Sequence, residues 1–508
     1  MRGRAWSRRD AFRLSGGAAA GLMATRKPVR AKSMSNIYTR IGVKPFINLT
    51  ATYTINGGAL TLPEVKRAMD EASRYSVNLD ELMEKVGVRL AELMGAEAAI
   101  VTSGCAAALA HSTAAAIAGA DPEKMQRLPH LDGMRDQVIM PKQSRNAYDH
   151  AFRSPGATIV EIDTAEEFHN ALSDRVALVA VLGTGEPKGR VRLEEMVAAA
   201  HKRGIPVIVD AAAELPFTPN PYLSRGADLV AYSGGKFLRG PQCAGILLGR
   251  KDLVQAAWLN SSPHHAFGRS MKVGKEEIMG MLAAIEVWKN SYDLKAEYRE
   301  WESWFQDISA AVTKVGGVST RVLPPAGASP FPVMEVSWDP ARVGLTAGEV
   351  GQQLLDGEPR IMSHAEGEGR SFIIRPVAIQ RGDHKAVASR LAEILRQAPP
   401  VRTASAAVPA RDISGNWRVT VEFIRGSAEH HLELSADGAS VAGTHRATSL
   451  TGRVQGTVRG SDVRLRSALP CEGTRLTYEF TGKVEGEHMS GEVGLGEYGR
   501  ARWSAVRV

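Results

Sequence analysis

The stretch DLVAYSGGKFLRGPQCAGILLG, residues 228–249, places one lysine, Lys236, between a glycine pair and a short basic loop. Apolar runs typical of buried strands lie on both sides of it. An amine attacks a carbonyl only in its neutral form, and a partly desolvated position at the end of a strand favours that form. The stretch therefore predicts a Schiff-base lysine held by glycines at the end of a buried strand.

A phosphate loop is the competing interpretation of these glycines. That motif needs a glycine further upstream and a Ser or Thr directly after the lysine, whose hydroxyl binds Mg²⁺. This chain has Val230 and Phe237 at those two positions. The pattern therefore excludes a phosphate loop of the nucleotide-binding kind.

The residues before this stretch alternate between helical and strand patterns. Apolar runs that end in turn residues predict short buried strands, and segments of 3.6-residue periodicity lie between them. The strand-like runs are AAIVTS, DQVIMP, GATIVEI, VALVAVLG and IPVIVDAAAE. Such repeated alternation predicts an α/β fold with a parallel, doubly wound sheet that is covered by helices on both faces.

Two further features fit a lysine that binds an aldehyde cofactor carrying a phosphate. Asp210 ends the run IPVIVD, where a carboxylate can pair with a pyridinium nitrogen. Ser103, Gly104 and Cys105 stand between a strand and a helix, so free backbone N–H groups face one point. Either feature alone is more often a simple cap or turn. Together with Lys236 they predict pyridoxal 5'-phosphate as the cofactor.

Several stretches resemble the pyridoxal-phosphate-dependent family of bacterial selenocysteine synthase (L-seryl-tRNA(Sec) selenium transferase) and D-glucosaminate-6-phosphate ammonia-lyase. The resemblance covers about residues 37–395 and implies a fold-type I, aspartate-aminotransferase-like large domain with a smaller α/β domain. The stretches are INLTATYTINGGALTLPEV, TSGCAAALA, NAYDHAFRSPGA, VDAAAELP, ADLVAYSGGKFLRGPQCAGILLGRKDL and GRSMKVGKEEI.

The resemblance also implies roles for individual residues. Lys236 is the internal-aldimine lysine and Asp210 the partner of the pyridinium nitrogen. The remaining candidates are a phosphate cup of Ser103, Gly104, Cys105 and Ser233, a ring-face contact from Gln143, Tyr148 or His150, and substrate-binding cations at Arg269, Lys272 and Arg375. Relatives tend to carry alanine and serine where this chain has Cys105 and Ala59, so the resemblance leaves the substrate open.

The reaction that these residues favour is β-elimination from an amino acid or amino-sugar acid, of the ammonia-lyase type. Racemisation and aldol cleavage use the same residues and stay open. Selenium transfer to seryl-tRNA is the next alternative, and a non-enzymatic one is an inactive scaffold that presents a ligand-binding β-domain. The glycine-rich arm at 52–58 is expected to reach the active site, of a neighbouring subunit in a homo-dimer or higher oligomer.

The chain divides into five segments by pattern and composition. After Asp412 alternating strands with glycine turns predict an antiparallel barrel or sandwich. The expected segments are a signal segment at 1–31, a large cofactor-binding domain with an N-terminal arm at 36–290, a small α/β domain at 291–398, a Pro/Ala linker at 399–410 and the β-domain at 411–508.

The net charge of +8 belongs to the first 35 residues, which hold nine Lys or Arg and one Asp. The rest is neutral, which argues against nucleic-acid binding. The twin arginines Arg8 and Arg9, a mildly apolar run from Ala18 to Ala24 and a small-residue site near Ala31 predict twin-arginine export to the periplasm, with the cytoplasm as the alternative.

The remaining composition excludes several classes. The three cysteines indicate neither a disulfide framework nor a zinc site. No apolar run approaches the roughly 20 residues of a membrane-spanning helix, so no membrane partner is expected.

Overall fold

The computed structural model describes residues 36–327, 329–399 and 411–508. The predicted signal segment and almost all of the predicted linker lie outside these residues. Residues 36–45 form a short unit of their own that contains one 3-10 turn, η1 (Thr39–Ile41). Among the described residues, no helix is both long enough and apolar enough to cross a membrane.

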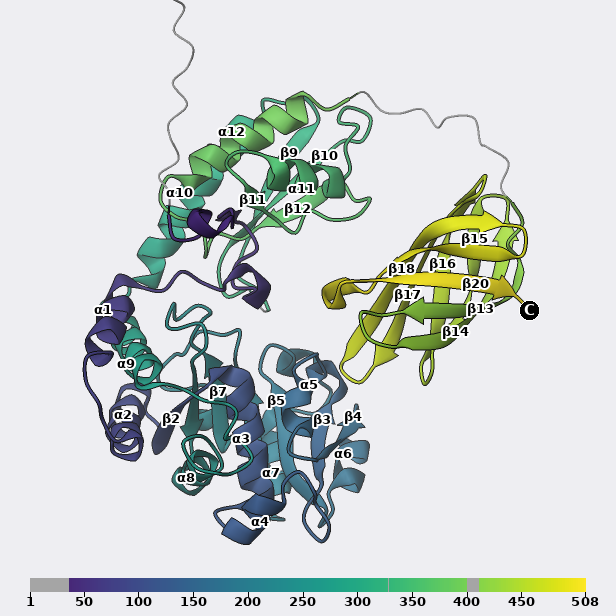
Figure 1. Cartoon of the computed structure of the whole chain (residues 1–508). Helices are drawn as coiled ribbons and strands as arrows, with labels where there is room; N and C mark the ends of the chain where they lie inside the picture. Colours follow the sequence, from purple (N-terminus) through teal and green to yellow (C-terminus); the bar gives the residue numbers. More distant parts are fainter. Residues whose placement is uncertain (1–35, 328, 400–410) are drawn as a thin grey trace, which may run out of the picture. The chain divides into compact units, whose positions relative to one another are not determined.

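A seven-stranded sheet forms the large domain, with helices packed against it (Figure 1). Its strand order is β2-β8-β7-β6-β5-β3-β4. The strands are β2 (Ala98–Thr102), β3 (Gln137–Pro141), β4 (Thr158–Ile162), β5 (Val176–Leu182), β6 (Val207–Asp210), β7 (Leu229–Ser233) and β8 (Gly245–Gly249). Most of their side chains are buried, as expected for strands covered on both faces.

The helices of this domain are mostly amphipathic and bury one side each. An exception is α3, whose many alanines let it pack with nearly its whole surface buried. The helices are α1 (Pro63–Ala72), α2 (Leu79–Met94), α3 (Gly104–Ala118), α4 (Pro122–Arg127), α5 (Asp149–Arg153), α6 (Ala165–Ala171), α7 (Leu193–His201), α8 (Lys251–Leu259) and α9 (Lys275–Asn290). Short 3-10 turns, among them η3 (Lys142–Ser144) and η4 (Glu186–Lys188), lie between them.

The prediction of a parallel sheet is wrong for one strand. β8 runs antiparallel to both of its neighbours, β7 and β2, whereas the other paired strands are parallel. β7 and β8 are joined by residues 234–244 without a crossover helix, and a chain that returns directly to its neighbour has to run antiparallel. The large domain is therefore a mixed α/β sheet.

A second hydrophobic core forms the small domain. Its antiparallel sheet has the order β12-β10-β9, and three helices pack with it. Residues of the N-terminal arm, Ile47, Leu49, Ala51 and Ala59, are buried in this core. The elements are β1 (Ile47–Asn48), η2 (Thr54–Asn56), α10 (Leu294–Val312), β9 (Val318–Leu323), β10 (Val333–Trp338), α11 (Ala347–Asp356), β11 (Ile361–Met362), β12 (Ser371–Ile374) and α12 (Asp383–Arg396), with β1 pairing in parallel with β11.

The C-terminal domain is a closed barrel of eight antiparallel strands. Of the two predicted alternatives, a barrel and a sandwich, the structure has the barrel. Buried and exposed residues alternate along the strands, so that the apolar ones fill a third core. The strands are β13 (Gly415–Glu422), β14 (Ser427–Asp437), β15 (Ser440–Arg446), β16 (Thr451–Arg459), β17 (Asp462–Cys471), β18 (Thr474–Glu485), β19 (His488–Gly494) and β20 (Arg500–Arg507).

Candidate active site

Lys236 lies in the loop between β7 and β8, and this loop is folded tightly on itself. The backbone N–H of Gly234 donates to the carbonyl of Ala244 at 2.8 Å, and that of Gly240 to the carbonyl of Gly234 at 2.9 Å. A Cβ atom on Gly235 would lie 2.5 Å from Cα of Gln242. The glycines are therefore required by close packing of the loop, which fixes the backbone that carries the lysine.

Asp210 ends β6 and is buried. Its Oδ1 accepts a hydrogen bond from the backbone N–H of Ala212 at 3.0 Å and lies 3.7 Å from Sγ of Cys105. Burial raises the pKa of Asp210, and the N–H of Ala212 and the nearby charge of Lys236 partly offset this rise. Burial also raises the pKa of the Cys105 thiol, with the Asp210 charge adding to the effect. The structure thus brings these three predicted residues together.

The first turn of α3 and the start of β8 lie close to each other. In the sheet, Gly245 pairs with Thr102 on one side and with Ser233 on the other, so Ser103 and Ser233 flank it. A Cβ on Gly245 would lie 2.5 Å from the carbonyl carbon of Gly104. Ser103 is the N-cap of α3 but makes no side-chain capping bond, which leaves first-turn N–H groups free for an anion.

These groups fit pyridoxal phosphate. Oδ2 of Asp210 accepts no hydrogen bond from the described residues, so it is available to accept one from a pyridinium N–H. The free N–H groups of α3, with the hydroxyls of Ser103 and Ser233, suit the phosphate. Lys236 supplies the amine. The observation that decides the fit is a buried carboxylate with one unfilled oxygen beside a lysine.

Of the three predicted ring-face residues, Tyr148 lies nearest to Lys236. Nζ of Lys236 is 5.8 Å from the centre of the Tyr148 ring, and burial followed by the Asp210 charge raises the pKa of this tyrosine. The Gln143 side chain instead packs against the backbone of Gly189, and His150 lies 3.2 Å from the guanidinium of Arg153. Tyr148 is therefore the best-placed of the three beside the amine.

Arg375 lies where the N-terminal arm meets the small domain. Its backbone N–H donates to the carbonyl of Leu49 at 3.1 Å, while its Nη1 is buried without a hydrogen-bond partner among the described residues. Nε2 of His364 is likewise buried and unpartnered, and the His364 ring lies 4.4 Å from that of Tyr53. Burial, and then the Arg375 charge, lower the pKa of His364. Arg375 thus retains unused donor capacity for an anion, and His364 lies beside it.

The same arm also contacts the Lys236 loop. The N–H of Ala59 donates to the carbonyl of Gly235 at 3.1 Å, and the amide of Gln242 donates to the carbonyl of Thr54 at 3.2 Å. The sequence identified the arm, which contains Tyr53, but gave no indication of His364. A histidine in a loop after a short strand gives a weak signal, because only the fold brings it to Arg375.

Arg269 and Lys272 are exposed and lie on a loop after α8. Arg269 donates to the hydroxyl of Ser262 at 3.2 Å, and the adjacent Gly268 packs against His111 in the middle of α3. No contact among the described residues joins either cation to Lys236 or Asp210. Within one chain, the structure does not bring these two candidates to the cofactor site.

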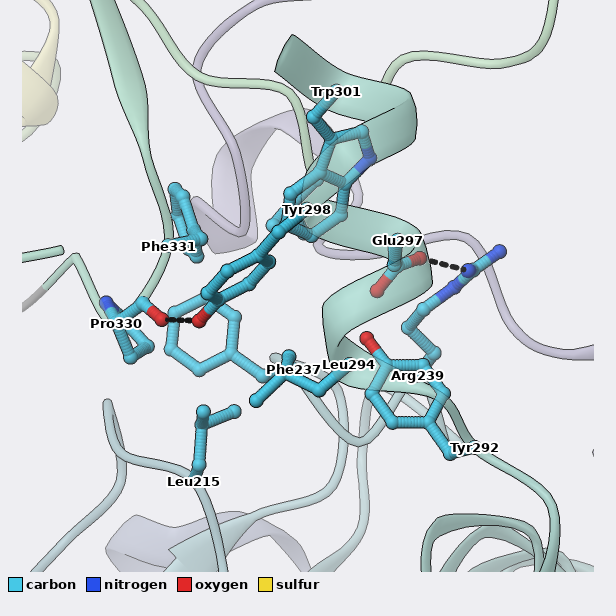
Figure 2. A pocket seen from close by; sticks show the side chains of 11 residues that line it. Leu215, Phe237, Arg239, Tyr292, Leu294, Glu297, Tyr298, Trp301, Pro330 and Phe331 are labelled. Carbon is cyan, nitrogen blue, oxygen red and sulfur yellow. Dashed lines mark hydrogen bonds and ion pairs between the residues drawn. The ribbon is translucent and has the colours of Figure 1, made fainter. Parts of the chain in front are cut away.

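Figure 2 shows an ion pair that ties the Lys236 loop to the small domain. Nη1 of Arg239 lies 3.3 Å from Oε1 of Glu297 on α10. The Arg239 backbone is held by Leu62, whose N–H donates to its carbonyl, and the Arg239 Nε donates to the Leu60 carbonyl. Burial raises the pKa of Glu297 to about 7, against the Arg239 charge, which lowers it. Glu297 therefore gains or loses its charge near neutral pH, and with it the ion pair that connects the Lys236 loop to the small domain.

Glu297→Gln is expected to flatten the pH dependence of stability between about pH 4.5 and pH 7. In that window the folded chain keeps the Glu297 proton, whereas the unfolded chain has lost it, so wild-type stability falls as pH rises. The slope is about 1.4 kcal/mol per pH unit for one proton. Thermal melts near both ends of the window measure this, with the exposed Glu302→Gln as control. A wild-type-to-variant difference in Tm that is constant with pH would contradict the assignment.

Comparison with known proteins adds the family. Residues 29–270 match the family described as Cys/Met metabolism PLP-dependent enzyme. D-glucosaminate-6-phosphate ammonia lyase of Salmonella typhimurium (strain 14028s / SGSC 2262) is 28% identical over 375 residues, which are 72% of this chain and 99% of that protein. The solved structure of a D-glucosaminate-6-phosphate ammonia-lyase matches with a TM-score of 0.64 over 72% of this chain and 99% of its own.

Two other kinds of relative are similar over the same region. 5'-C-glycyluridine monooxygenase-decarboxylase of a Streptomyces species is 30% identical over 372 residues, 70% of this chain and 92% of that protein. L-seryl-tRNA(Sec) selenium transferase of Proteus mirabilis (strain HI4320) is 25% identical over 337 residues, 58% of this chain and 66% of that protein. With the Lys236 and Asp210 site, these similarities identify the chain as an enzyme of the pyridoxal-phosphate-dependent Cys/Met metabolism family, homologous to D-glucosaminate-6-phosphate ammonia-lyase and selenocysteine synthase.

Proposed function

We propose that this enzyme acts by β-elimination on an amino acid or amino-sugar acid that carries a leaving group on Cβ. Loss of the Cα proton and of that group gives an enamine, which water hydrolyses to a 2-oxo acid and ammonia. The main observation behind the proposal is that the N-terminal arm contacts both the Lys236 loop and Arg375. The Nη1 atom of Arg375 is buried and has no partner among the described residues. The similarity to an ammonia lyase over 99% of its length supports the same reaction type.

Each residue has a defined task in this reaction. The Lys236 amine removes the proton from Cα of the substrate and passes it to the departing β-substituent, which leaves in protonated form. When bound, the cofactor supplies a sink for the negative charge that this step leaves on Cα. Asp210 keeps the pyridine nitrogen protonated, and Cys105 packs beside that carboxylate in the buried site. Tyr148, whose ring centre lies 5.8 Å from Nζ of Lys236, is assigned the contact with the face of the cofactor ring.

The substrate carboxylate is assigned to Arg375 and His364. A buried guanidinium nitrogen without a partner costs free energy unless an anion binds it, and a carboxylate can take both of its parallel N–H groups. His364 lies beside it, and Nε2 of His364 is also buried without a partner among the described residues. This pair selects an α-amino carboxylic acid rather than a simple amine.

The test of the proposed function is a substrate screen on the purified holoenzyme. Hydroxy-amino acids and amino-sugar acids, with and without a phosphate, are incubated and assayed for ammonia and 2-oxo acid in equal amounts. Release of both supports β-elimination. Inversion at Cα without ammonia would instead establish a racemase, aldehyde and glycine an aldolase, and oxygen uptake with CO₂ release an oxidative decarboxylase.

Arg375→Gln is expected to raise KM for the best substrate about tenfold to a hundredfold, with a smaller effect on kcat, because a charged hydrogen bond is lost. Steady-state kinetics of ammonia release measure both constants. Arg321→Gln is the control, since Arg321 lies exposed on β9 of the same domain. An unchanged KM in Arg375→Gln would show that the substrate carboxylate binds elsewhere.

We also propose that the chain works as a homo-dimer or higher oligomer. Arg269 and Lys272 lie away from the cofactor site within one chain, and both are exposed. In an oligomer these cations of one subunit face the active site of the next, whereas the arm at 52–58, which was expected to reach a neighbouring subunit, contacts the Lys236 loop of its own chain. Light scattering at the working concentration tests this, and a fully active monomer would refute it.

Export is a further part of the proposal. The twin arginines Arg8 and Arg9 suit a route that moves folded proteins, and the cofactor has to meet a folded pocket before export. An exported site meets few phosphorylated sugars, so we propose an unphosphorylated substrate. Cell fractionation is expected to place cleaved wild type in the periplasm and the Arg8→Lys, Arg9→Lys double variant in the cytoplasm. Uncleaved wild type in the cytoplasm would refute export.

A further inference from the structure

The thiol of Cys105 is a buried group of the cofactor site to which the proposed reaction gives no task. Cys105 lies in the first turn of α3 and is 7% exposed. Its Sγ lies 3.7 Å from Oδ1 of Asp210, a distance at which a thiol forms a weak hydrogen bond. Among the described residues, Cys105 is the one side chain that makes a hydrogen bond to this carboxyl group. The contact therefore bears on how Asp210 is held.

The proton in this hydrogen bond belongs to sulfur. Burial raises the pKa of the Cys105 thiol, and the Asp210 charge raises it further against the opposing charge of Lys236, so the thiol is neutral. Ionised Asp210 can only accept. If the carboxyl group is protonated instead, its proton sits on Oδ2, because Oδ1 already accepts the backbone N–H of Ala212. In both states the S–H of Cys105 donates and Oδ1 accepts.

The two oxygens of Asp210 therefore have different surroundings. Oδ1 accepts two hydrogen bonds, from the thiol of Cys105 and from the N–H of Ala212 at 3.0 Å. Oδ2 accepts none from the described residues. Rotation of an aspartate carboxylate about its last bond is soft, so donors on one oxygen are needed to fix its direction. The two donors on Oδ1 leave Oδ2 as the oxygen that faces a ring nitrogen.

The fold holds the helix turn that carries the thiol against the sheet that carries Asp210. A Cβ on Gly245, at the start of β8, would lie 2.6 Å from the backbone nitrogen of Cys105. The oxygen Oγ1 of Thr102 donates to the carbonyl of Gly104 at 2.9 Å and ties the same turn to β2. Strand β8 pairs with β7, and β7 pairs with β6, which ends at Asp210. The separation of sulfur and carboxylate is thus set by close packing of the backbone.

The same helix turn serves both ends of the cofactor. Its free backbone N–H groups suit the phosphate, and its Cys105 side chain contacts the carboxylate that suits the ring nitrogen. A change in the thiol is therefore expected to act on the nitrogen end, while the phosphate groups stay in place.

We propose that Cys105 is a positioning residue, whose thiol donates a hydrogen bond to Oδ1 of Asp210 and holds the carboxylate with Oδ2 free to accept from the pyridinium nitrogen. The thiol itself forms no bond with the substrate. The inference rests on the cofactor site and not on the choice between β-elimination, racemisation and aldol cleavage, because each of these needs the same charged partner for the ring.

Infrared spectroscopy of the full-length protein, with the cofactor bound and after its removal, tests the hydrogen bond itself. The S–H stretch lies where other protein groups absorb little, and it moves to lower frequency when the thiol donates. The difference between wild type and Cys105→Ala isolates the band of Cys105. Asp210→Ala removes the acceptor and is expected to move this band to higher frequency, whereas Asp174→Ala should leave it unchanged. A missing S–H band, or one that Asp210→Ala does not move, would overturn the proposal.

Two variants separate the hydrogen bond from the volume of the side chain. Cys105→Ala has no donor, and it is expected to bind the cofactor about tenfold more weakly and to lower kcat about tenfold with little change in KM. Cys105→Ser keeps a donor and should regain most of both. Cys471→Ala, which removes a cysteine of β17, is the control and should behave as wild type.

Titration of the cofactor-free protein, followed by visible absorbance, measures the affinity independently of turnover. Wild-type affinity and kcat in Cys105→Ala would refute the positioning role, and so would equal losses in the alanine and serine variants, which would indicate packing alone. If Cys105→Ala fails to fold, the affinity of Cys105→Ser and the shift of the S–H band in Asp210→Ala still decide the question.

Discussion

Lys236→Ala should yield a folded protein that no longer retains its cofactor after borohydride reduction and denaturation. Lys236 is the amine in the loop that also contains Gly234 and Gly235, and Asp210 lies beside it. Because the same amine moves the Cα proton, turnover should fall by about a thousandfold or more. Mass spectrometry of the reduced protein and assays of ammonia release measure the two effects independently.

The control for this variant is Lys202→Ala, which changes an exposed lysine after α7. It should keep both the covalent adduct and full activity. A reduced adduct of unchanged mass in Lys236→Ala would mean that another amine binds the cofactor, and the assignment of the site would then be wrong.

Asp210→Asn separates cofactor binding from chemistry. The amide fills nearly the same space at the end of β6 but cannot hold the pyridine nitrogen protonated. We expect weaker but measurable cofactor binding and a fall in kcat of about a hundredfold to a thousandfold, the usual cost of removing one aligned electrostatic group. Visible absorbance of the bound cofactor and steady-state kinetics measure these quantities.

Asp174→Asn, in an exposed turn before β5, is the matched control and should behave as wild type. Full activity in Asp210→Asn would show that the pyridine nitrogen needs no charged partner.

The buried strands, the loop that contains Lys236 and the position of Asp210 could be predicted from the sequence. Buried strands read as continuous apolar runs, and glycines marked the loop that has to pack on itself around Lys236. Asp210 could be proposed because it follows such a run directly. These signals depend on neighbours in the chain, and they are present in a single sequence.

The parts that sequence reasoning missed depend on contacts between distant residues. The direction of β8 follows from the absence of a helix between 234 and 244, which apolar patterning alone does not show. Ile47 and Leu49 are buried in the core of the small domain because β1 pairs with β11, more than three hundred residues further on. His364 was missed because its neighbours, Arg375 and Tyr53, lie on other segments of the chain and only the fold brings them to it.

The closure of the barrel has a consequence for how this protein behaves in a crowded compartment. In a closed barrel every strand is paired on both sides, as β13 is with β14 and β20, so no edge offers unpaired N–H and C=O groups to another chain. By contrast, β4 and β9 end their sheets with a free side among the described residues. Strand-to-strand aggregation of partly unfolded enzyme is therefore expected to start in the catalytic domains, while the barrel stays inert as an attached folded body.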